Sequence, residues 1–197
     1  MSPFHPRAAT LSALVAAGGL GGLRFGRSEF TFTHRDPADH RWRPEMGGGA
    51  LLDVGVYCLA PLLGAAGRPP LSVAAAEVAA GAGVDASFSG WLDFGQGFTA
   101  CFAASFEAPE RQHLELVGTR ATALVDGAYA AGAPGYRGQL LYDNGRVEDL
   151  TGPDDDPYRR MVEHFDAVVR SRVDPVRPPS KSVELLRVVD RLREAAA

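Results

Sequence analysis

A carboxylate and a phenol lie four residues apart in segment 44–58, where three consecutive glycines lead into an apolar run. These residues are Asp53 and Tyr57, and on a helix this spacing places both side chains on one face, one turn apart. Gly47-Gly48-Gly49 lets a loop approach a ligand closely and then enter a helix, whose first amides favour negative charge. Such a pair can polarise a carbonyl or hydroxyl group and exchange a proton with it. A structural alternative stays open, in which Tyr57 is a core aromatic and Asp53 pairs locally.

The polar loop at residues 34–44 supplies further candidates. A phenol is protonated at neutral pH and is a poor base unless a cation lies close. Arg41 and Arg43 are candidates for that cation, with a solvated loop as the alternative. Trp42 is a candidate for stacking on a substrate, unless it packs on the sheet instead. His164, on a later helix, is the histidine we single out as a substrate-binding candidate.

The elements that must position these residues follow from hydrophobic periodicity and turn signals. We expect helices at residues 7–17 and 50–63, the second apolar on most sides and therefore buried. One strand is expected between them, at residues 24–33. Two amphipathic helices close the chain, one after residue 157 and one from Ser180, which caps it. The other strands are expected as a run of six, at residues 73–80, 84–94, 98–106, 113–117, 121–125 and 140–150.

The links in this run fit tight hairpins, and Asn144-Gly145 is the strongest such signal. Hairpin succession favours antiparallel pairing. We therefore expect an α+β fold: a mostly antiparallel, open-faced sheet of about six or seven strands, with helices packed on one face. In the strand at 84–94, Trp91 falls on the face opposite the core residues. That second face is either an oligomer interface or a surface that the same chain covers.

Composition excludes several classes of function. The net charge is −4 and no cluster of basic residues suits a phosphate backbone, so we do not expect nucleic-acid binding. The longest apolar stretch carries Asp53 and several glycines, so we do not expect a membrane span. Cys58 and Cys101 lie in apolar runs without zinc-ligand spacing, which favours buried free thiols, no metal site and a cytoplasmic protein.

Segment 47–57 resembles the GGGxLxDxGxY motif of the glucose–fructose oxidoreductase / inositol dehydrogenase family (Gfo/Idh/MocA). It is most similar to the dihydrodiol and D-xylose dehydrogenase branch, which has tyrosine where other members have histidine. Phe4-His5-Pro6 and residues 18–23 and 157–165 also resemble the family, so the resemblance spans nearly the whole chain. It implies the family's C-terminal substrate domain, with Tyr57 as proton donor and acceptor and Asp53 in support. It also implies that Gly48 and Gly49 lie near the nicotinamide and that a homodimer forms through the sheet face.

We expect a single domain over residues 1–197, without the dinucleotide-binding domain that the family carries upstream. Segment 19–24 lacks the third glycine of the dinucleotide fingerprint, and it lies between a helix and a strand, not between a strand and a helix. The family's Glu-Lys-Pro lysine is absent as well, and Lys181 lies in the wrong place to replace it. We therefore expect no cofactor within this chain, and NAD(P) only if a separate dinucleotide-binding chain exists.

Three functions remain open on these grounds. The first hypothesis is a cofactor-independent enzyme built on an orphaned substrate domain. It would catalyse acid/base-assisted isomerisation, dehydration or cyclisation of a sugar- or polyketide-like substrate, with natural-product biosynthesis as one setting. The second is the substrate-binding half of a split NAD(P)-dependent dehydrogenase. The third is a non-catalytic dimerisation or binding module, because fold alone does not fix chemistry.

Overall fold

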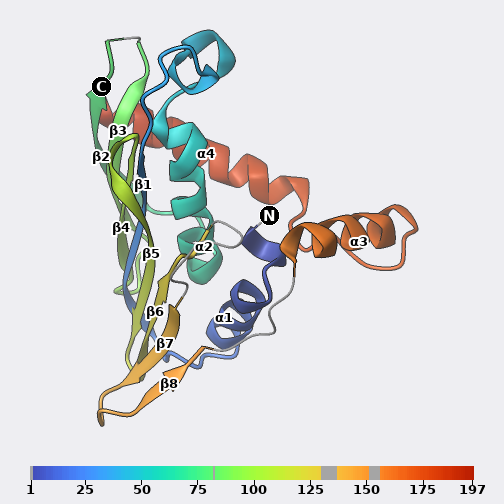
Figure 1. The fold of residues 1–197 in the computed structure, drawn as a ribbon. Coiled ribbons are helices and arrows are strands. Elements are labelled where there is room, and N and C mark those ends of the chain that lie inside the picture. Colours follow the sequence, from blue (N-terminus) through green and yellow to red (C-terminus); the bar gives the residue numbers. More distant parts are fainter. Residues whose placement is uncertain (1, 82, 130–136, 151–155) are drawn as a thin grey trace.

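The computed structural model describes residues 2–81, 83–129, 137–150 and 156–197. In this part of the chain a single sheet of eight strands has the order β2-β3-β4-β1-β5-β6-β7-β8 (Figure 1). Neighbouring strands are antiparallel, except that β1 runs parallel to β4. The strands are β1 (Leu23–Thr33), β2 (Ser72–Ala79), β3 (Asp85–Asp93), β4 (Thr99–Ser105), β5 (Glu107–Gly118), β6 (Ala121–Asp126), β7 (Arg137–Tyr142) and β8 (Val147–Asp149).

The α+β class and the mostly antiparallel sheet are confirmed. The expected number of six or seven strands is corrected to eight, and one pair, β1 with β4, is parallel. Residues 140–150, taken as one strand, form parts of β7 and β8 on either side of the Asn144-Gly145 turn, where Gly145 has φ +81°. Strand β1 lies between β4 and β5, so its parallel partner comes from a distant part of the chain. Local hairpin signals carry no information about such an insertion.

The helices lie on one side of the sheet (Figure 1). Helix α2 contacts β1 and β4, α4 contacts β2, and α1 contacts α2. Helix α3 extends away from the rest of the domain, and the N-terminal turn η1 lies at its base. The helices and turns are η1 (Ser2–Phe4), α1 (Pro6–Ala16), η2 (His40–Trp42), η3 (Pro44–Met46), the π-helical turn η4 (Leu51–Gly55), α2 (Val56–Ala66), α3 (Pro157–Val169) and α4 (Pro179–Ala196).

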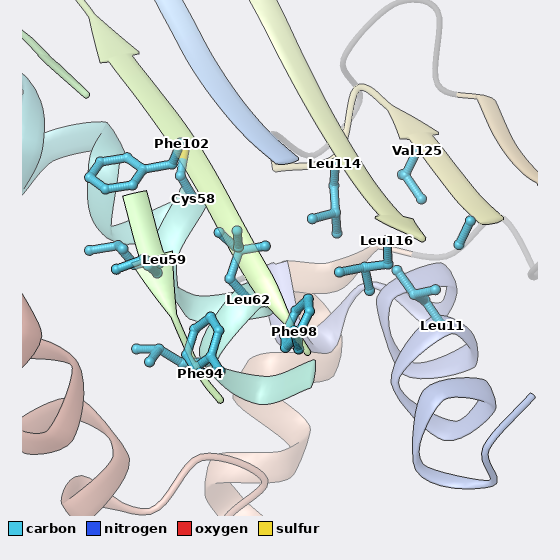
Figure 2. Close-up of a cluster of buried hydrophobic side chains, with 14 of the residues drawn as sticks. Leu11, Cys58, Leu59, Leu62, Phe94, Phe98, Phe102, Leu114, Leu116 and Val125 are labelled. Carbon is cyan, nitrogen blue, oxygen red and sulfur yellow. The ribbon is translucent and has the colours of Figure 1, made fainter. Parts of the chain in front are cut away.

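The core lies between α2 and the sheet. Cys58, Leu59 and Leu62 of α2 are completely buried and point toward the aromatic side chains around β4, including Phe98 and Phe102 (Figure 2). Each buried leucine contributes about 2 kcal/mol through removal of its apolar surface from water. Together Cys58, Leu59 and Leu62 fix the rotation of α2 and therefore the direction in which its opposite face points.

Segment Pro44–Ala66 has the length and apolar composition of a membrane-spanning helix. Half of its most apolar window is buried inside this fold. It is also broken into the turns η3 and η4 and the helix α2, and α2 packs on the sheet. These features are typical of a core helix.

Candidate functional site

The glycine triplet forms a tight corner between the polar loop and the π-helical turn η4. Gly47 adopts a left-handed conformation with φ +71° and closes the η3 turn. The amide of Gly48 donates to the carbonyl of Arg43 at 3.0 Å, and that of Gly49 donates to the carbonyl of Arg41 at 2.9 Å. Added Cβ atoms at Gly48 and Gly49 would meet the Arg41 carbonyl and the Asp85 carboxylate. Both glycines are therefore buried against other residues of the chain, and this close packing leaves no room for a side chain.

Asp85, at the start of β3, holds this corner in place and was not predicted from the sequence. Its Oδ2 accepts the Leu51 amide at 2.6 Å, which satisfies a donor at the start of the helical segment. The side chain is only 7% exposed, and burial raises the pKa of its carboxyl group. A Cβ added at Gly49 would overlap Asp85 Oδ1, so the carboxylate packs directly against this glycine.

The π-helical turn η4 carries Asp53, and Arg41 from the turn η2 holds its carboxylate. Arg41 Nε donates to Asp53 Oδ2 at 2.7 Å, and both side chains are less than one third exposed. The same guanidinium lies 3.3 Å from Asp39, whose Oδ1 in turn caps η2 by accepting the Arg41 amide at 2.9 Å. The hydrogen bond with Asp53 raises the pKa of Arg41. The arginine considered as a cation for Tyr57 is thus paired with Asp53.

Tyr57 follows one turn later, in the first turn of α2, on the face that the core does not use. It is 37% exposed, and its ring packs edge-on against Phe30 of β1 at 5.8 Å between centroids. Tyr129 lies 6.4 Å from the same ring and stacks on Phe30 at 5.5 Å. Pro61 has no N–H to donate to the Tyr57 carbonyl four residues earlier, so this helical turn lacks one backbone hydrogen bond. Two aromatic rings therefore contact Tyr57, and the rest of its side chain is exposed to solvent.

The aromatic floor under Tyr57 is fixed by a buried hydrogen-bond network. Tyr129 is 4% exposed, and its hydroxyl lies 2.5 Å from Ser28 Oγ and donates to the His113 carbonyl at 3.1 Å. Burial raises the pKa of Tyr129 well above its ordinary value, so this phenol stays protonated. Sequence reasoning missed Phe30, Tyr129 and Ser28, because the pairing of β1 with distant strands places Phe30 and Ser28, and the segment after β6 places Tyr129.

A cleft of about 950 Å³ extends from Tyr57 between α1, α2 and α4. Its wall is mostly apolar, and the polar side chains on it include Ser12, Arg177 and Ser182. A mainly apolar cleft with a few convergent polar groups is the usual form of a small-molecule site. Tyr57 is therefore one of the residues that line a cavity large enough for a sugar-sized ligand.

The other predicted residues lie away from this cleft. Trp42 packs edge-on against Phe106 at 5.3 Å and stacks on His34 at 6.2 Å, in the arrangement of an aromatic that closes a small core. Arg43 is exposed on the surface of the loop. His164 of α3 accepts the Val176 amide at 3.0 Å, and its ring lies 5.3 Å from that of Phe4. A substrate-binding role for these three residues stays a prediction.

The same residues bear on metal binding and on contact with a cofactor. No group of three or more His, Cys, Asp or Glu side chains suited to a metal ion occurs among the residues that the structure describes. Gly48 and Gly49 are buried, and added Cβ atoms there would meet Arg41 and Asp85, so their place near a nicotinamide stays a prediction.

Comparison with known proteins identifies a family that this chain matches and several similar enzymes. Residues 8–124 match the sequence model of the GFO/IDH/MocA C-terminal domain. D-xylose 1-dehydrogenase (NADP(+)) 2 of Haloferax volcanii is 32% identical over 100% of this chain and 60% of its own length. A dTDP-3,4-didehydro-2,6-dideoxy-α-D-glucose 3-reductase of Saccharopolyspora spinosa is 33% identical over 85% of this chain and 51% of its own. The chain thus spans little more than half the length of these relatives.

The fold is that of a solved aldose-aldose oxidoreductase from Caulobacter crescentus, with a TM-score of 0.87 at 22% identity over 99% of this chain and 59% of that one. These relatives are dehydrogenases, reductases and oxidoreductases by name. The expectation of a cofactor-independent isomerase, dehydratase or cyclase is therefore wrong. It relied on the absence of a dinucleotide-binding segment from residues 1–197, whereas the proteins that this chain resembles are redox enzymes by name.

Proposed function

Because the chain belongs to the GFO/IDH/MocA family through its C-terminal domain, we propose that it is the substrate-binding half of an NAD(P)-dependent dehydrogenase or reductase. Its substrate class is a sugar-like secondary alcohol or the corresponding ketone or aldehyde. The observation that carries the proposal is Tyr57, exposed at the end of the cleft and one turn from the Asp53 carboxylate that Arg41 holds. The dinucleotide-binding half is supplied by another domain.

In this proposal Tyr57 moves the proton. During reduction its hydroxyl donates a proton to the substrate carbonyl oxygen, and the phenolate then regains a proton from water; during oxidation the proton moves the other way. The nicotinamide, when bound, supplies or accepts the hydride at the substrate carbon. Asp53 uses Oδ2 for Arg41, which leaves Oδ1 to accept a hydrogen bond from a substrate hydroxyl. The apolar cleft wall, once the dinucleotide-binding domain covers Tyr57, helps to exclude water from the reacting atoms.

A chimera tests the proposal. The part of the Haloferax volcanii D-xylose dehydrogenase that precedes the matched region is fused ahead of this chain, and NADP+ reduction is measured with a panel of aldoses, inositols and dihydrodiols. We expect turnover of at least one of these substrates, and a loss of about 100-fold or more in Tyr57→Phe, as for the removal of a general acid. The matched control is Tyr142→Phe, since Tyr142 lies on β7 and bonds Glu148. A chimera that binds NADPH but turns over none of the panel, or equal rates in the two variants, would contradict the proposal.

We also infer that two copies associate through the sheet face that points away from the helices. A shallow groove of about 590 Å³ on this face is lined by Phe25, Trp91 and Cys101, among others. Trp91 is 47% exposed, although its ring packs on Phe25 at 5.8 Å. Large exposed apolar side chains on a flat sheet favour self-association. Light scattering should give twice the chain mass, and Trp91→Lys should give the monomer; a monomeric parent protein at tens of micromolar would contradict this inference.

A further inference from the structure

Asp39 lies at the centre of a group of charged side chains that leads to Asp53. Its Oδ1 accepts the Arg41 amide at 2.9 Å, and each of its two carboxylate oxygens lies 3.3 Å from Arg41 Nη1. His34 Nε2 lies 3.4 Å from Oδ2, and His40 Nδ1 lies 3.1 Å from Oδ1. The hydrogen bond from the Arg41 amide and the positive charge of the Arg41 side chain lower the pKa of Asp39, so its carboxyl group is ionised at neutral pH.

One guanidinium group is therefore shared between two carboxylates. Arg41 donates through Nε to Asp53 Oδ2 at 2.7 Å and through Nη1 to Asp39. The ring of Phe32, whose centroid lies 5.9 Å from the Arg41 Cζ, supports the guanidinium from a third side. Within the part of the chain that the structure describes, Arg41 bonds Asp53 through Nε alone, so Oδ1 of Asp53 is left over.

An arginine beside a carboxylate frequently forms a two-pronged pair instead. Nε and Nη2 of a guanidinium are parallel donors, and their spacing matches the two oxygens of one carboxylate. In the pair of Arg41 with Asp53 only Nε is used, while Nη1, which lies outside that fork, is held by Asp39. Without the charge of Asp39, Arg41 is free to turn and to bond both oxygens of Asp53.

We propose that Asp39 is a positioning residue, which holds Arg41 back from the two-pronged pair and so keeps Oδ1 of Asp53 open for a substrate hydroxyl. The inference rests on the proposed function, in which Oδ1 accepts that hydrogen bond. Asp39 acts through Arg41 and therefore affects substrate binding more than proton transfer at Tyr57. It favours substrates that carry a hydroxyl group within reach of Asp53, since an analogue without that hydroxyl gains nothing from a free Oδ1.

Kinetics of the chimera with the Haloferax volcanii dinucleotide-binding part test the positioning, with the best substrate of the panel and its monodeoxy analogues. Asp39→Asn keeps the cap of η2, because asparagine is an equally good N-cap, but removes the charge. We expect KM to rise about tenfold while kcat changes less than threefold, and the analogue that lacks the bonded hydroxyl to show no rise. Arg41→Lys added to Asp39→Asn should lower KM again, because lysine cannot form the two-pronged pair. The matched control is Asp36→Asn in the same loop, since Asp36 Oδ1 accepts the Ala38 amide; it should leave KM unchanged.

The geometry is tested without turnover. Crystal structures of this chain and of its Asp39→Asn variant should show Arg41 bonded to Asp53 through Nε alone in the parent, and through both Nε and Nη2 in the variant. If Asp39→Asn does not fold, Asp39→Ser, which also caps a helical turn, takes its place.

The outcomes separate this inference from the proposed function. The same contact between Arg41 and Asp53 in both structures would overturn the role of Asp39. So would a rise in KM that is equal for the substrate and all its deoxy analogues, or a loss in kcat alone. A two-pronged pair in the variant, without turnover by the parent chimera, would support the role of Asp39 and contradict the proposed function. Turnover with a KM that Asp39→Asn leaves unchanged would do the reverse.

Discussion

The three glycines before the π-helical turn should respond very differently to alanine. All three precede the turn that carries Asp53, and two have positive φ angles: Gly47 at +71° and Gly49 at +107°. An added Cβ at Gly47 meets nothing within 4 Å, so Gly47→Ala costs only the left-handed conformation, about 1 kcal/mol. At Gly49 the Cβ overlaps Asp85 Oδ1, so the carboxylate must rotate and release the buried Leu51 amide. That adds about 1–3 kcal/mol to a backbone cost of similar size, or roughly 2–6 kcal/mol together.

Thermal unfolding followed by circular dichroism measures these costs. For a chain of this size each kcal/mol lowers the melting temperature by about 2–4 °C, so Gly47→Ala should be barely visible and Gly49→Ala should lose roughly 5–20 °C. Gly48→Ala, whose Cβ would lie 2.5 Å from the Arg41 carbonyl, should resemble Gly49→Ala. In the Asp85→Ala background the extra cost of Gly49→Ala over Gly47→Ala should largely disappear. Equal losses at positions 47 and 49 would refute the role of Asp85.

Three further predictions concern buried groups. Burial raises the folded-state pKa of Asp85, so its contribution to stability is present below about pH 4 and is lost as pH rises through that folded pKa. The free energy of unfolding, measured from pH 3 to 7, should therefore rise for Asp85→Asn relative to the parent chain as pH increases. A difference between the two that stays constant with pH would contradict this. Burial raises the pKa of Cys58 to about 12, so Ellman's reagent should modify Cys101 in the folded chain and Cys58 only after unfolding. Rapid modification of both thiols in the folded chain would contradict this prediction. Leu59→Ala should destabilise by about 2–5 kcal/mol in the same unfolding assay, because Leu59 is completely buried; a loss below about 1 kcal/mol would mean that the core closes around the gap.

Features that depend on nearby residues were predictable from the sequence. The spacing of Asp53 and Tyr57 placed both on one helical segment, and the glycine triplet marked its beginning. Hydrophobic periodicity located α1, α2 and α4, because each buries a face at helical spacing. The π-helical form of the turn at Asp53 was not predicted, since it reflects how Leu51 and Gly55 pack in the core.

Features that depend on distant pairing were not predictable. Asp85 reaches the glycine corner from a strand that begins 34 residues after Leu51, and no local pattern links the two. Phe30 lies under Tyr57 because β1 is inserted between β4 and β5. The sequence also predicted an amphipathic helix after residue 157, whereas Phe165 on its apolar face is 68% exposed. Amphipathic periodicity identifies the apolar face of a helix, but not the surface that will cover it.

The exposure of Tyr57 connects the site with the architecture. A proton-transferring phenol works best where water is excluded, because charge that develops on the substrate oxygen is then stabilised by fixed groups. This chain shields the ring of Tyr57 from below with Phe30 and Tyr129, and it fixes Asp53 with Arg41. It leaves more than a third of Tyr57 in solvent. A partner domain that covers Tyr57 would complete its enclosure, so docking of that domain and the exclusion of water from Tyr57 are expected to be one event.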